Sequence, residues 1–252
     1  MKHPLVFAPT TLLHSPPLEC LRAALDAGYD GTGLRVHPSP HLPFHPLLGD
    51  SALIREVKAL VRELPLLDLY SFYLRPESTV ESFVPALELG AELGAKYALV
   101  QGDDADDARL VERFAAFCDA AAPLGLAAAL EFVPGRVIST LPKALDLIRH
   151  AGRSNACVLV DTLHFVRAGH APAELRSLDI PYLQISDAGQ GERRIPGEGE
   201  LPLDALLDAV PEGMPLSVEV VPPKSGTPPG WARQVLEGTR RFIEARASRR
   251  SA

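Results

Sequence analysis

Four side chains with carboxylate or amide groups stand near the ends of four consecutive apolar runs in the second half of the chain. They are Glu131, Asp161, Gln184 and Glu219. A single glutamate in a strand is usually exposed or salt-bridged, and an unpaired buried carboxylate is strongly unfavourable. If the four runs are neighbouring strands, the four side chains converge on one point. Three carboxylates and an amide oxygen there would bind a divalent metal ion.

Further side chains that could bind a substrate or move a proton follow these runs or their neighbours. His164 lies three residues after Asp161, where we expect the start of a loop near the metal. Arg193 and Arg194 precede Pro196–Gly199, a rigid turn in which an arginine can clamp a carboxylate or phosphate through two hydrogen bonds. We expect at least one of this pair to be a solvated charge. Other candidates for the same mouth are Arg35, His37, Tyr73 and Lys224.

Eight short apolar runs predict buried strands. Most are continuous rather than alternating, which is typical of parallel strands covered on both faces. The predicted strands are Leu5–Ala8, Gly33–Val36, Leu66–Phe72, Tyr97–Gln101, Ala127–Val133, Cys157–Asp161, Tyr182–Ser186 and Leu216–Val221. Helical patterns lie between them. Eight strand–helix units in 252 residues predict an α/β fold, a single (β/α)8 TIM barrel with its active site at the C-terminal ends of the strands.

A doubly wound open sheet is the alternative fold, but it usually has a glycine-rich loop after the first strand. Here residues 9–13 follow the first predicted strand, and they contain no glycine. No stretch resembles an interdomain linker. We therefore predict one barrel domain over residues 1–247 and a disordered tail over residues 248–252, which contains Arg249 and Arg250.

The composition narrows the function classes. Lys and Arg number 25 against 32 Asp and Glu, a net charge of −7, which argues against nucleic-acid and anionic-membrane partners. No apolar run approaches the roughly 20 residues of a membrane span, and residues 1–5 do not resemble a secretory signal. The 3 cysteines are far apart and predict a reducing, cytoplasmic location. We expect a small-molecule substrate as partner, and a homo-oligomer is left open.

The barrel, the side-chain series with its Asp161-x-x-His164 motif, and the Pro196–Gly199 turn resemble the xylose-isomerase-like superfamily. Its members include sugar-phosphate isomerases and epimerases, inosose-type enzymes and 3-dehydroshikimate dehydratases. The resemblance covers most of the chain and is strongest from Leu130 to Val221. It implies that Glu131, Asp161, Gln184 and Glu219 bind one divalent ion, Mn²⁺ or Mg²⁺ ahead of Co²⁺ or Zn²⁺.

The same resemblance implies roles for three residues. His164 would bind substrate or act as acid/base, and Glu131 and Glu219 would transfer protons in the epimerase branch. Gln184 stands where many epimerases have histidine; an amide favours a harder, oxygen-binding ion and also occurs in the dehydratase branch. The DNA-repair branch uses a histidine-rich zinc cluster. Gln101 and Gln184 at the strand ends, and no Asp-x-His after the seventh strand, argue against that branch.

Three functions follow. The first is a metal-dependent isomerase or epimerase that acts on a hydroxy-ketone sugar or related metabolite by proton abstraction through a metal-stabilised enediolate. The second is a metal-dependent lyase, similar to 3-dehydroshikimate dehydratase, in which a β-hydroxyl leaves and His164 is the acid/base. The third, from another class, is a non-catalytic metabolite-binding barrel. The complete ligand set argues against it, because a decayed enzyme would be expected to lose a carboxylate.

Overall fold

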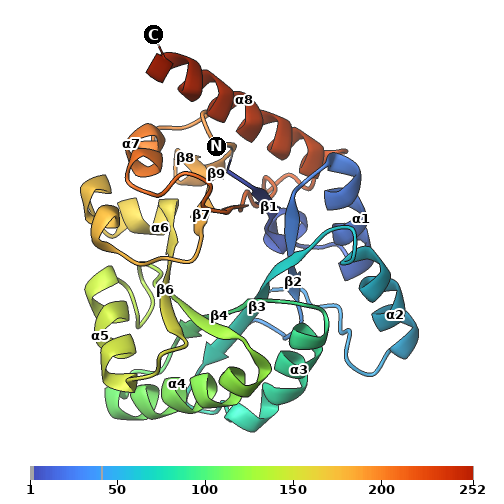
Figure 1. Ribbon diagram of the computed structural model, residues 1–252, viewed down its shortest axis with the longest axis vertical. Helices are drawn as coiled ribbons and strands as arrows, with labels where there is room; N and C mark the ends of the chain where they lie inside the picture. The colour runs from blue at the N-terminus through green and yellow to red at the C-terminus, as the bar shows by residue number, and fades with distance from the viewer. Residues whose placement is uncertain (1–2, 41, 252) are drawn as a thin grey trace.

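Eight parallel strands close into a barrel in the computed structural model, which describes residues 3–40 and 42–251. The strands lie in the order β1-β10-β7-β6-β5-β4-β3-β2 (Figure 1). They are β1 Leu5–Phe7, β2 Gly31–Arg35, β3 Leu66–Leu74, β4 Tyr97–Gly102, β5 Ala127–Glu131, β6 Ala156–Asp161, β7 Leu183–Ile185 and β10 Leu216–Val218. The predicted TIM barrel is confirmed, and β7 and β10 are shorter than their apolar runs suggested.

Helices surround the barrel and bury their apolar faces against it (Figure 1). The α-helices are α1 Pro17–Ala27, α2 Ser51–Leu60, α3 Val84–Glu92, α4 Asp107–Ala121, α5 Leu141–Ala151, α6 Thr162–Arg167, α7 Leu203–Asp208 and α8 Trp231–Ser251. Short 3-10 helices cover η1 Pro9–Leu12, η2 Val80–Ser82, η3 Ala122–Leu124 and η4 Pro172–Ser177. None of the helices among the described residues is long and apolar enough to cross a membrane.

Two apolar clusters form the core. The larger lies between the strands and the helices, and the smaller lies inside the barrel. The inner cluster consists of Ala8, Tyr70, Leu99, Ala129, Leu159 and Tyr182. Its two tyrosines carry hydroxyl groups, so the barrel interior is not purely apolar beneath its mouth.

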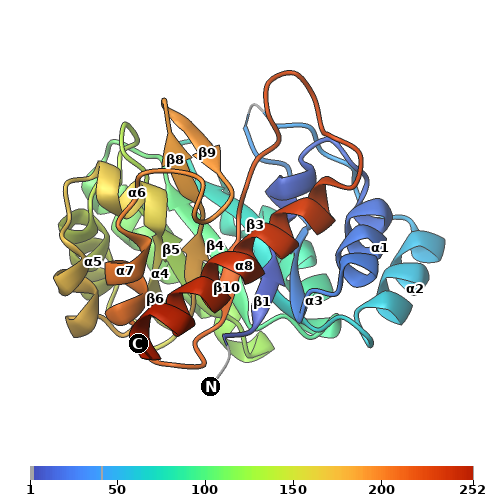
Figure 2. The same cartoon turned by 90° about the horizontal axis from the view of Figure 1, so that it is seen from above.

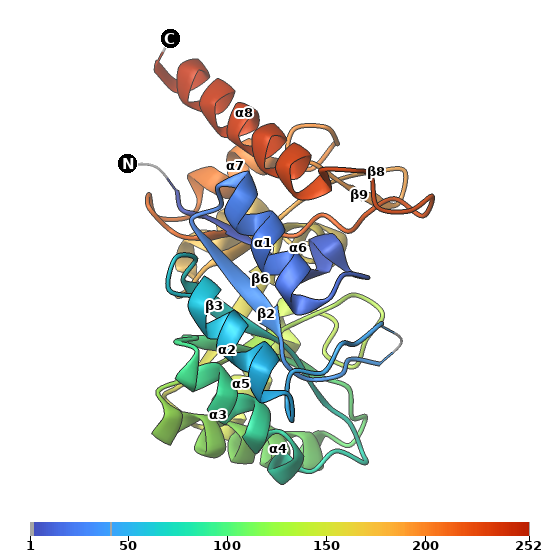
Figure 3. The same cartoon turned by 90° about the vertical axis from the view of Figure 1, so that its right-hand side faces the viewer.

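A two-stranded antiparallel hairpin, β8 Asp187–Gly189 and β9 Glu192–Arg194, rises at the C-terminal end of the strands. The loop before α8 stands beside it, while the start of β1 and the end of α8 lie toward the opposite end (Figures 2 and 3). Because the eight strands of the barrel are parallel, their C-terminal ends all lie at the mouth that carries this hairpin. This arrangement places the predicted site residues at one end of the molecule.

The predicted disordered tail is wrong for residues 248–251, because α8 continues through Ser251. Arg249 and Arg250 lie 3.0 and 3.2 Å from carboxylate oxygens of Asp204 and Asp208, on or near α7. Positive side chains at a helix C-terminus also interact favourably with the helix dipole. Met1, Lys2 and Ala252, which the sequence predictions include, lie outside the described residues.

Candidate active site

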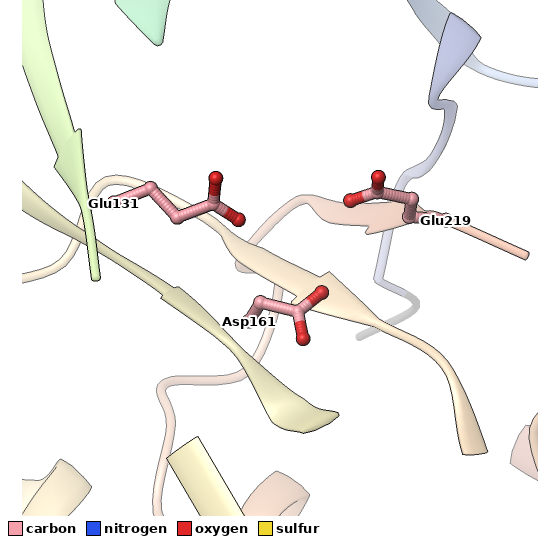
Figure 4. Close-up of side chains that lie close together, drawn as sticks. All are labelled: Glu131, Asp161 and Glu219. Carbon is pink, nitrogen blue, oxygen red and sulfur yellow. The ribbon is translucent and has the colours of Figure 1, made fainter. Parts of the chain in front are cut away.

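Three carboxylates meet at the mouth of the barrel. Glu131 ends β5, Asp161 ends β6 and Glu219 follows β10, and their relative exposures are 5%, 1% and 9%. Figure 4 shows the three carboxylate groups turned toward one another. One potential ligand atom from each lies within 4.8 Å of the others. The convergence inferred from the strand ends is therefore present for these three side chains.

Two neutral side chains donate hydrogen bonds to the two glutamates of this cluster. Gln101 Nε2 donates to Glu131 Oε2 at 2.5 Å, and Thr10 Oγ1 donates to Glu219 Oε1 at 2.8 Å. Sequence reasoning did not identify Gln101 or Thr10 as partners of the site. One signal was available, because each stands at or just beyond the end of a predicted strand. Each contact fixes one carboxylate oxygen, and the other oxygen of each group stays available to the centre.

Asp161 links the centre to α6. Its Oδ1 accepts the backbone N–H of His164 at 3.0 Å, so Asp161 is the N-cap of that helix. We expected His164 at the start of a loop, but the cap places it in the first helical turn. The His164 Nε2 atom lies 4.0 Å from Glu131 Oε1. His164 therefore lies beside the carboxylates, as its spacing from Asp161 suggested.

Arg193 inserts a positive charge into the cluster. Its Nη1 donates to Asp161 Oδ2 at 2.8 Å and to Ser186 Oγ at 2.7 Å. Its Nη2 lies 3.9 Å from Glu219 Oε2. The adjacent Arg194 is exposed, so one member of the pair enters the site and the other remains at the rim. Both lie on β9, the second strand of the hairpin, which precedes the Pro196–Gly199 turn.

A buried carboxylate anchors the hairpin that carries Arg193. Asp187 Oδ1 accepts the N–H groups of Ala188 and Leu201 at 2.8 and 2.9 Å. Its Oδ2 accepts those of Gly197 and Gly199, both at 3.0 Å. A Cβ on Gly199 would lie 2.4 Å from the Ala188 carbonyl oxygen, so only glycine fits. The Pro196–Gly199 turn thus wraps around Asp187 and holds β9 over the mouth.

Gln184 completes the predicted ligand series. It pairs with Asp161 in the register of β6 and β7, and it is fully buried. Its Nε2 donates to the Tyr70 hydroxyl at 2.6 Å, whereas its Oε1 has no hydrogen-bond partner among the described residues. A buried carbonyl oxygen without a partner is unfavourable. This free oxygen and the three carboxylates form a donor set that fits a divalent, oxygen-liganded ion.

Burial and neighbouring charges shift the pKa values of the four ionisable side chains described next in different directions. Burial, with the neighbouring charges of Glu219 and Asp161, raises the pKa of Glu131 well above its usual value. Burial also raises the pKa of Glu219, although Arg193 opposes the shift. Burial acts in the same sense on Asp161, but Arg193 and His164 outweigh it and lower the pKa of that carboxyl. Burial lowers the pKa of His164, which keeps the ring neutral near pH 7.

A cavity of about 350 Å³ lies beside the site and is lined in part by the β8–β9 hairpin, but its lining includes neither the three carboxylates nor Gln184. Its lining includes His164, Arg193, Arg194 and Lys224. The Lys224 side chain is 94% exposed, and its Nζ lies 3.8 Å from Glu192 Oε1. Four of the predicted site residues therefore line the same cavity.

The remaining three candidates do not line this cavity. Tyr73 is buried near the end of β3, where burial and the nearby charge of Glu131 raise its pKa. Arg35 donates from Nη1 to the Leu13 carbonyl oxygen at 3.3 Å. His37 packs its ring edge-on against Phe83, with centroids 4.9 Å apart, in the layer between the barrel and the helices. The chain turns outward after β2, so the structure does not bring His37 together with the carboxylates through any contact of its ring.

A closed (β/α)8 barrel with three buried carboxylates at its C-terminal mouth defines the class of protein. The family described as "Xylose isomerase-like TIM barrel" matches residues 21–242. The chain belongs to this family.

Individual proteins show more distant similarity. An inosose isomerase of Bacillus velezensis is 34% identical over 107 residues, which are 37% of this chain and 38% of that protein. The match thus spans well under half the length of this relative. The structure titled IOLI protein with a binding zinc atom is 22% identical, with a TM-score of 0.77 and 99% of each chain covered. An L-ribulose 3-epimerase structure is 18% identical, with a TM-score of 0.76 and coverage of 100% and 97%. These structural similarities establish the fold alone.

Proposed function

We propose that the protein is a divalent-metal-dependent isomerase or epimerase that acts on a hydroxy-ketone sugar or related small metabolite in the cytoplasm. The observation that carries the proposal is the group of three buried carboxylates whose ligand atoms lie within 4.8 Å of one another. Burying three such groups together is unfavourable without a cation, and Arg193 supplies only one positive charge. The similar proteins named as an isomerase and an epimerase support the same class of reaction.

Glu131, Asp161, Gln184 and Glu219 would hold the ion. When bound, it would supply electrophilic polarisation of a substrate carbonyl next to the carbon that loses its proton. An all-oxygen donor set favours Mn²⁺ or Mg²⁺ over zinc. The zinc in the structure of the IOLI protein belongs to that protein, and Co²⁺ or Zn²⁺ remain alternatives here.

Glu131 and Glu219 are the proposed proton-transfer groups. They extend from β5 and from the end of β10, and their carboxylates face each other across the centre (Figure 4). Their raised pKa values bring both groups closer to the range in which a carboxyl can both take and return a proton. A substrate between them would expose opposite faces to two bases, as isomerisation or epimerisation requires.

The cationic wall of the mouth would orient the substrate. Arg193 can donate from Nη2 while its Nη1 remains on Asp161. Arg194 and Lys224 line the cavity with fewer constraints and would contact the outer part of the substrate. Guanidinium groups bind oxygen-rich or anionic substrates through paired hydrogen bonds.

Dehydration of a cyclic hydroxy-keto acid is the second candidate. The neutral His164 ring favours it, because its Nε2 lies near Glu131 and 3.4 Å from Arg193 Nη2 at the cavity wall. In this arrangement His164 would take the proton from carbon as a base and then give it to the leaving β-hydroxyl, so that water leaves and the proton does not return to carbon.

Turnover in D₂O with added Mn²⁺ or Mg²⁺ separates these reactions. Keto-sugars and dehydroshikimate are screened by NMR. Solvent deuterium beside the carbonyl, in a product of unchanged formula, supports isomerisation or epimerisation. Loss of water with a new conjugated absorbance supports the lyase. Substrate binding without turnover supports the non-catalytic alternative and contradicts the proposal.

A further inference from the structure

Two pairs of buried polar side chains occupy the barrel interior beneath the carboxylates. The Tyr182 hydroxyl donates to Asp68 Oδ2 at 2.6 Å. The Tyr70 hydroxyl accepts from Gln184 Nε2 at 2.6 Å. Both tyrosines are almost fully buried and belong to the same inner cluster. Only the second pair includes a proposed metal ligand.

The contact with Tyr70 fixes the whole amide of Gln184. Nitrogen and oxygen lie in one plane on the same carbon, so an anchored nitrogen determines where the oxygen points. Gln184 lies on β7, between β6 and β10, and its neighbours in register are Asp161 and Ser217. Its Oε1 is buried and has no hydrogen-bond partner in the described part of the chain. The strand that carries this free oxygen thus lies between the strands that end in Asp161 and lead into Glu219.

We propose that Tyr70 is a positioning residue for the metal centre: it accepts the amide N–H of Gln184 and thereby presents the amide oxygen to the ion. This inference rests on the proposed function, because it requires a bound divalent ion. An amide oxygen fixed in this way makes the site prefer ions that favour oxygen ligands. Without the anchor, the amide can rotate and turn its N–H groups toward the ion, where they cannot serve as ligands.

The surroundings of Tyr70 suit the role of acceptor. Its hydroxyl lies 3.5 Å from Ser217 Oγ, which can accept a hydrogen bond from it. A lone pair of the Tyr70 oxygen then remains to accept the N–H of Gln184. The reverse arrangement, with Tyr70 donating to Oε1, would direct the amide N–H groups at the carboxylates.

The test compares two matched variants, Tyr70→Phe and Tyr182→Phe. Each removes one buried hydroxyl with a 2.6 Å hydrogen bond from the same barrel interior. Dissociation constants for Mn²⁺ and Zn²⁺ are measured by titration of metal-free protein. We expect Tyr70→Phe to weaken Mn²⁺ binding by about 10- to 100-fold, the usual effect of removing a group that orients a ligand. Zn²⁺ should lose less, because the three carboxylates and one water molecule already supply the four ligands that it requires. Tyr182→Phe should keep the wild-type ratio of the two affinities.

The outcomes distinguish the two proposals. Wild-type protein that binds neither ion overturns the proposed function and this inference together. Wild-type binding with equal Mn²⁺ to Zn²⁺ ratios in both variants overturns the role of Tyr70 and leaves the proposed function standing. A Mn²⁺ loss confined to Tyr70→Phe supports the inference.

A measurement on the wild-type protein covers the case in which Tyr70→Phe does not fold. Glutamine side chains are labelled with ¹³C and ¹⁵N, and the Gln184 signals are identified by comparison with Gln184→Glu. On addition of diamagnetic Mg²⁺, we expect the Gln184 carbonyl carbon to shift while its amide protons stay protected from exchange. An unshifted carbonyl carbon, or amide protons that become exposed to exchange, would overturn the inference.

Discussion

Asp161 carries more constraints than its neighbours at the centre. It caps α6, pairs with Arg193 and keeps a lowered pKa, so it remains ionised when Glu131 and Glu219 tend to be protonated. An anion that is already charged and oriented binds a cation without a prior proton loss. At the residue scale, Asp161 is therefore the ligand on which metal binding depends most.

Replacement of Asp161 by alanine should abolish metal binding. In the wild type, Mn²⁺ binds the folded state and should raise the melting temperature, by an amount equivalent to about 4 kcal/mol at 1,000 times Kd. Asp161→Ala should show no rise, whereas the exposed Asp179→Ala should keep it. The measurement is thermal unfolding with EDTA and with increasing Mn²⁺. A full Mn²⁺ shift in Asp161→Ala would exclude this residue as a ligand.

Replacement of Gln184 by histidine should change which ion is preferred. An imidazole nitrogen binds Zn²⁺ and Co²⁺ better than an amide oxygen does, and it contributes less to Mn²⁺ or Mg²⁺ binding. We expect the Zn²⁺ to Mn²⁺ affinity ratio to rise by about tenfold or more, measured by competition with a chelator. Gln101→His is the control, because Gln101 touches Glu131 rather than the centre itself. An unchanged ratio in Gln184→His would remove Gln184 from the ligand set.

The sequence predicted the acidic residues of the site but not the residues that hold them. Glu131, Asp161 and Glu219 each stand at or near the end of an apolar run, and the barrel brings such ends together whatever its detailed geometry. Tyr70 and Thr10 reach the site across the barrel or from a 3-10 helix. Those contacts depend on strand tilt and stagger, which the order of residues along the chain does not specify.

The β8–β9 hairpin is the element that most changes the site. The sequence indicated a turn from its prolines and glycines but did not predict two paired strands. The structure shows how the chain reverses there: Gln190 and Gly191 both have positive φ, at 52° and 83°, as in the two-residue turns that join antiparallel strands. The strands are only three residues each, too short for an alternating pattern to be recognised. Arg193 reaches Asp161 only because this hairpin folds back over the mouth.

Asp187→Asn should loosen this hairpin. The carboxylate accepts four backbone N–H groups, and an amide replaces one acceptor oxygen with a donor that faces them. We expect a loss of about 2–3 kcal/mol in the free energy of unfolding, from hydrogen bonds to a charged group. The amides of Gly197 and Gly199 should also exchange faster with deuterium.

The control for the hairpin is Glu192→Gln, which alters a partly exposed carboxylate on β9 whose partner is the exposed Lys224. It should change the free energy of unfolding by less than about 0.5 kcal/mol. Equal exchange at Gly197 and Gly199 in Asp187→Asn and wild type would show that the turn does not need the Asp187 bridge.

The repeat of strands and helices was enough to predict a closed barrel for the whole molecule. Eight units, each long enough for one strand and one covering helix, fit within the 252 residues. The end of α8 was not predictable in the same way. Arg249 and Arg250 find Asp204 and Asp208 only after barrel closure brings α7 beside α8. Before closure, the last residues are simply polar and resemble a tail.

The closed barrel also buries an acid far from solvent, and this should make stability depend on pH. Asp68 is fully buried, and burial raises its pKa from 3.8 to about 7, although the hydrogen bond from Tyr182 opposes the shift. Because the folded state holds the proton more tightly than the unfolded chain, the stabilising contribution of Asp68 is complete below pH about 4. It is lost as the pH rises to about 7. Three pKa units correspond to about 4 kcal/mol.

Asp68→Asn cannot ionise, so its free energy of unfolding should fall less than that of the wild type between pH 4 and pH 8. Urea unfolding in EDTA measures both proteins across this range, with Asp179→Asn as the exposed control. Parallel pH profiles for Asp68→Asn and wild type would mean that Asp68 ionises inside the barrel without strain, and that the barrel interior is more polar than its apolar lining suggests.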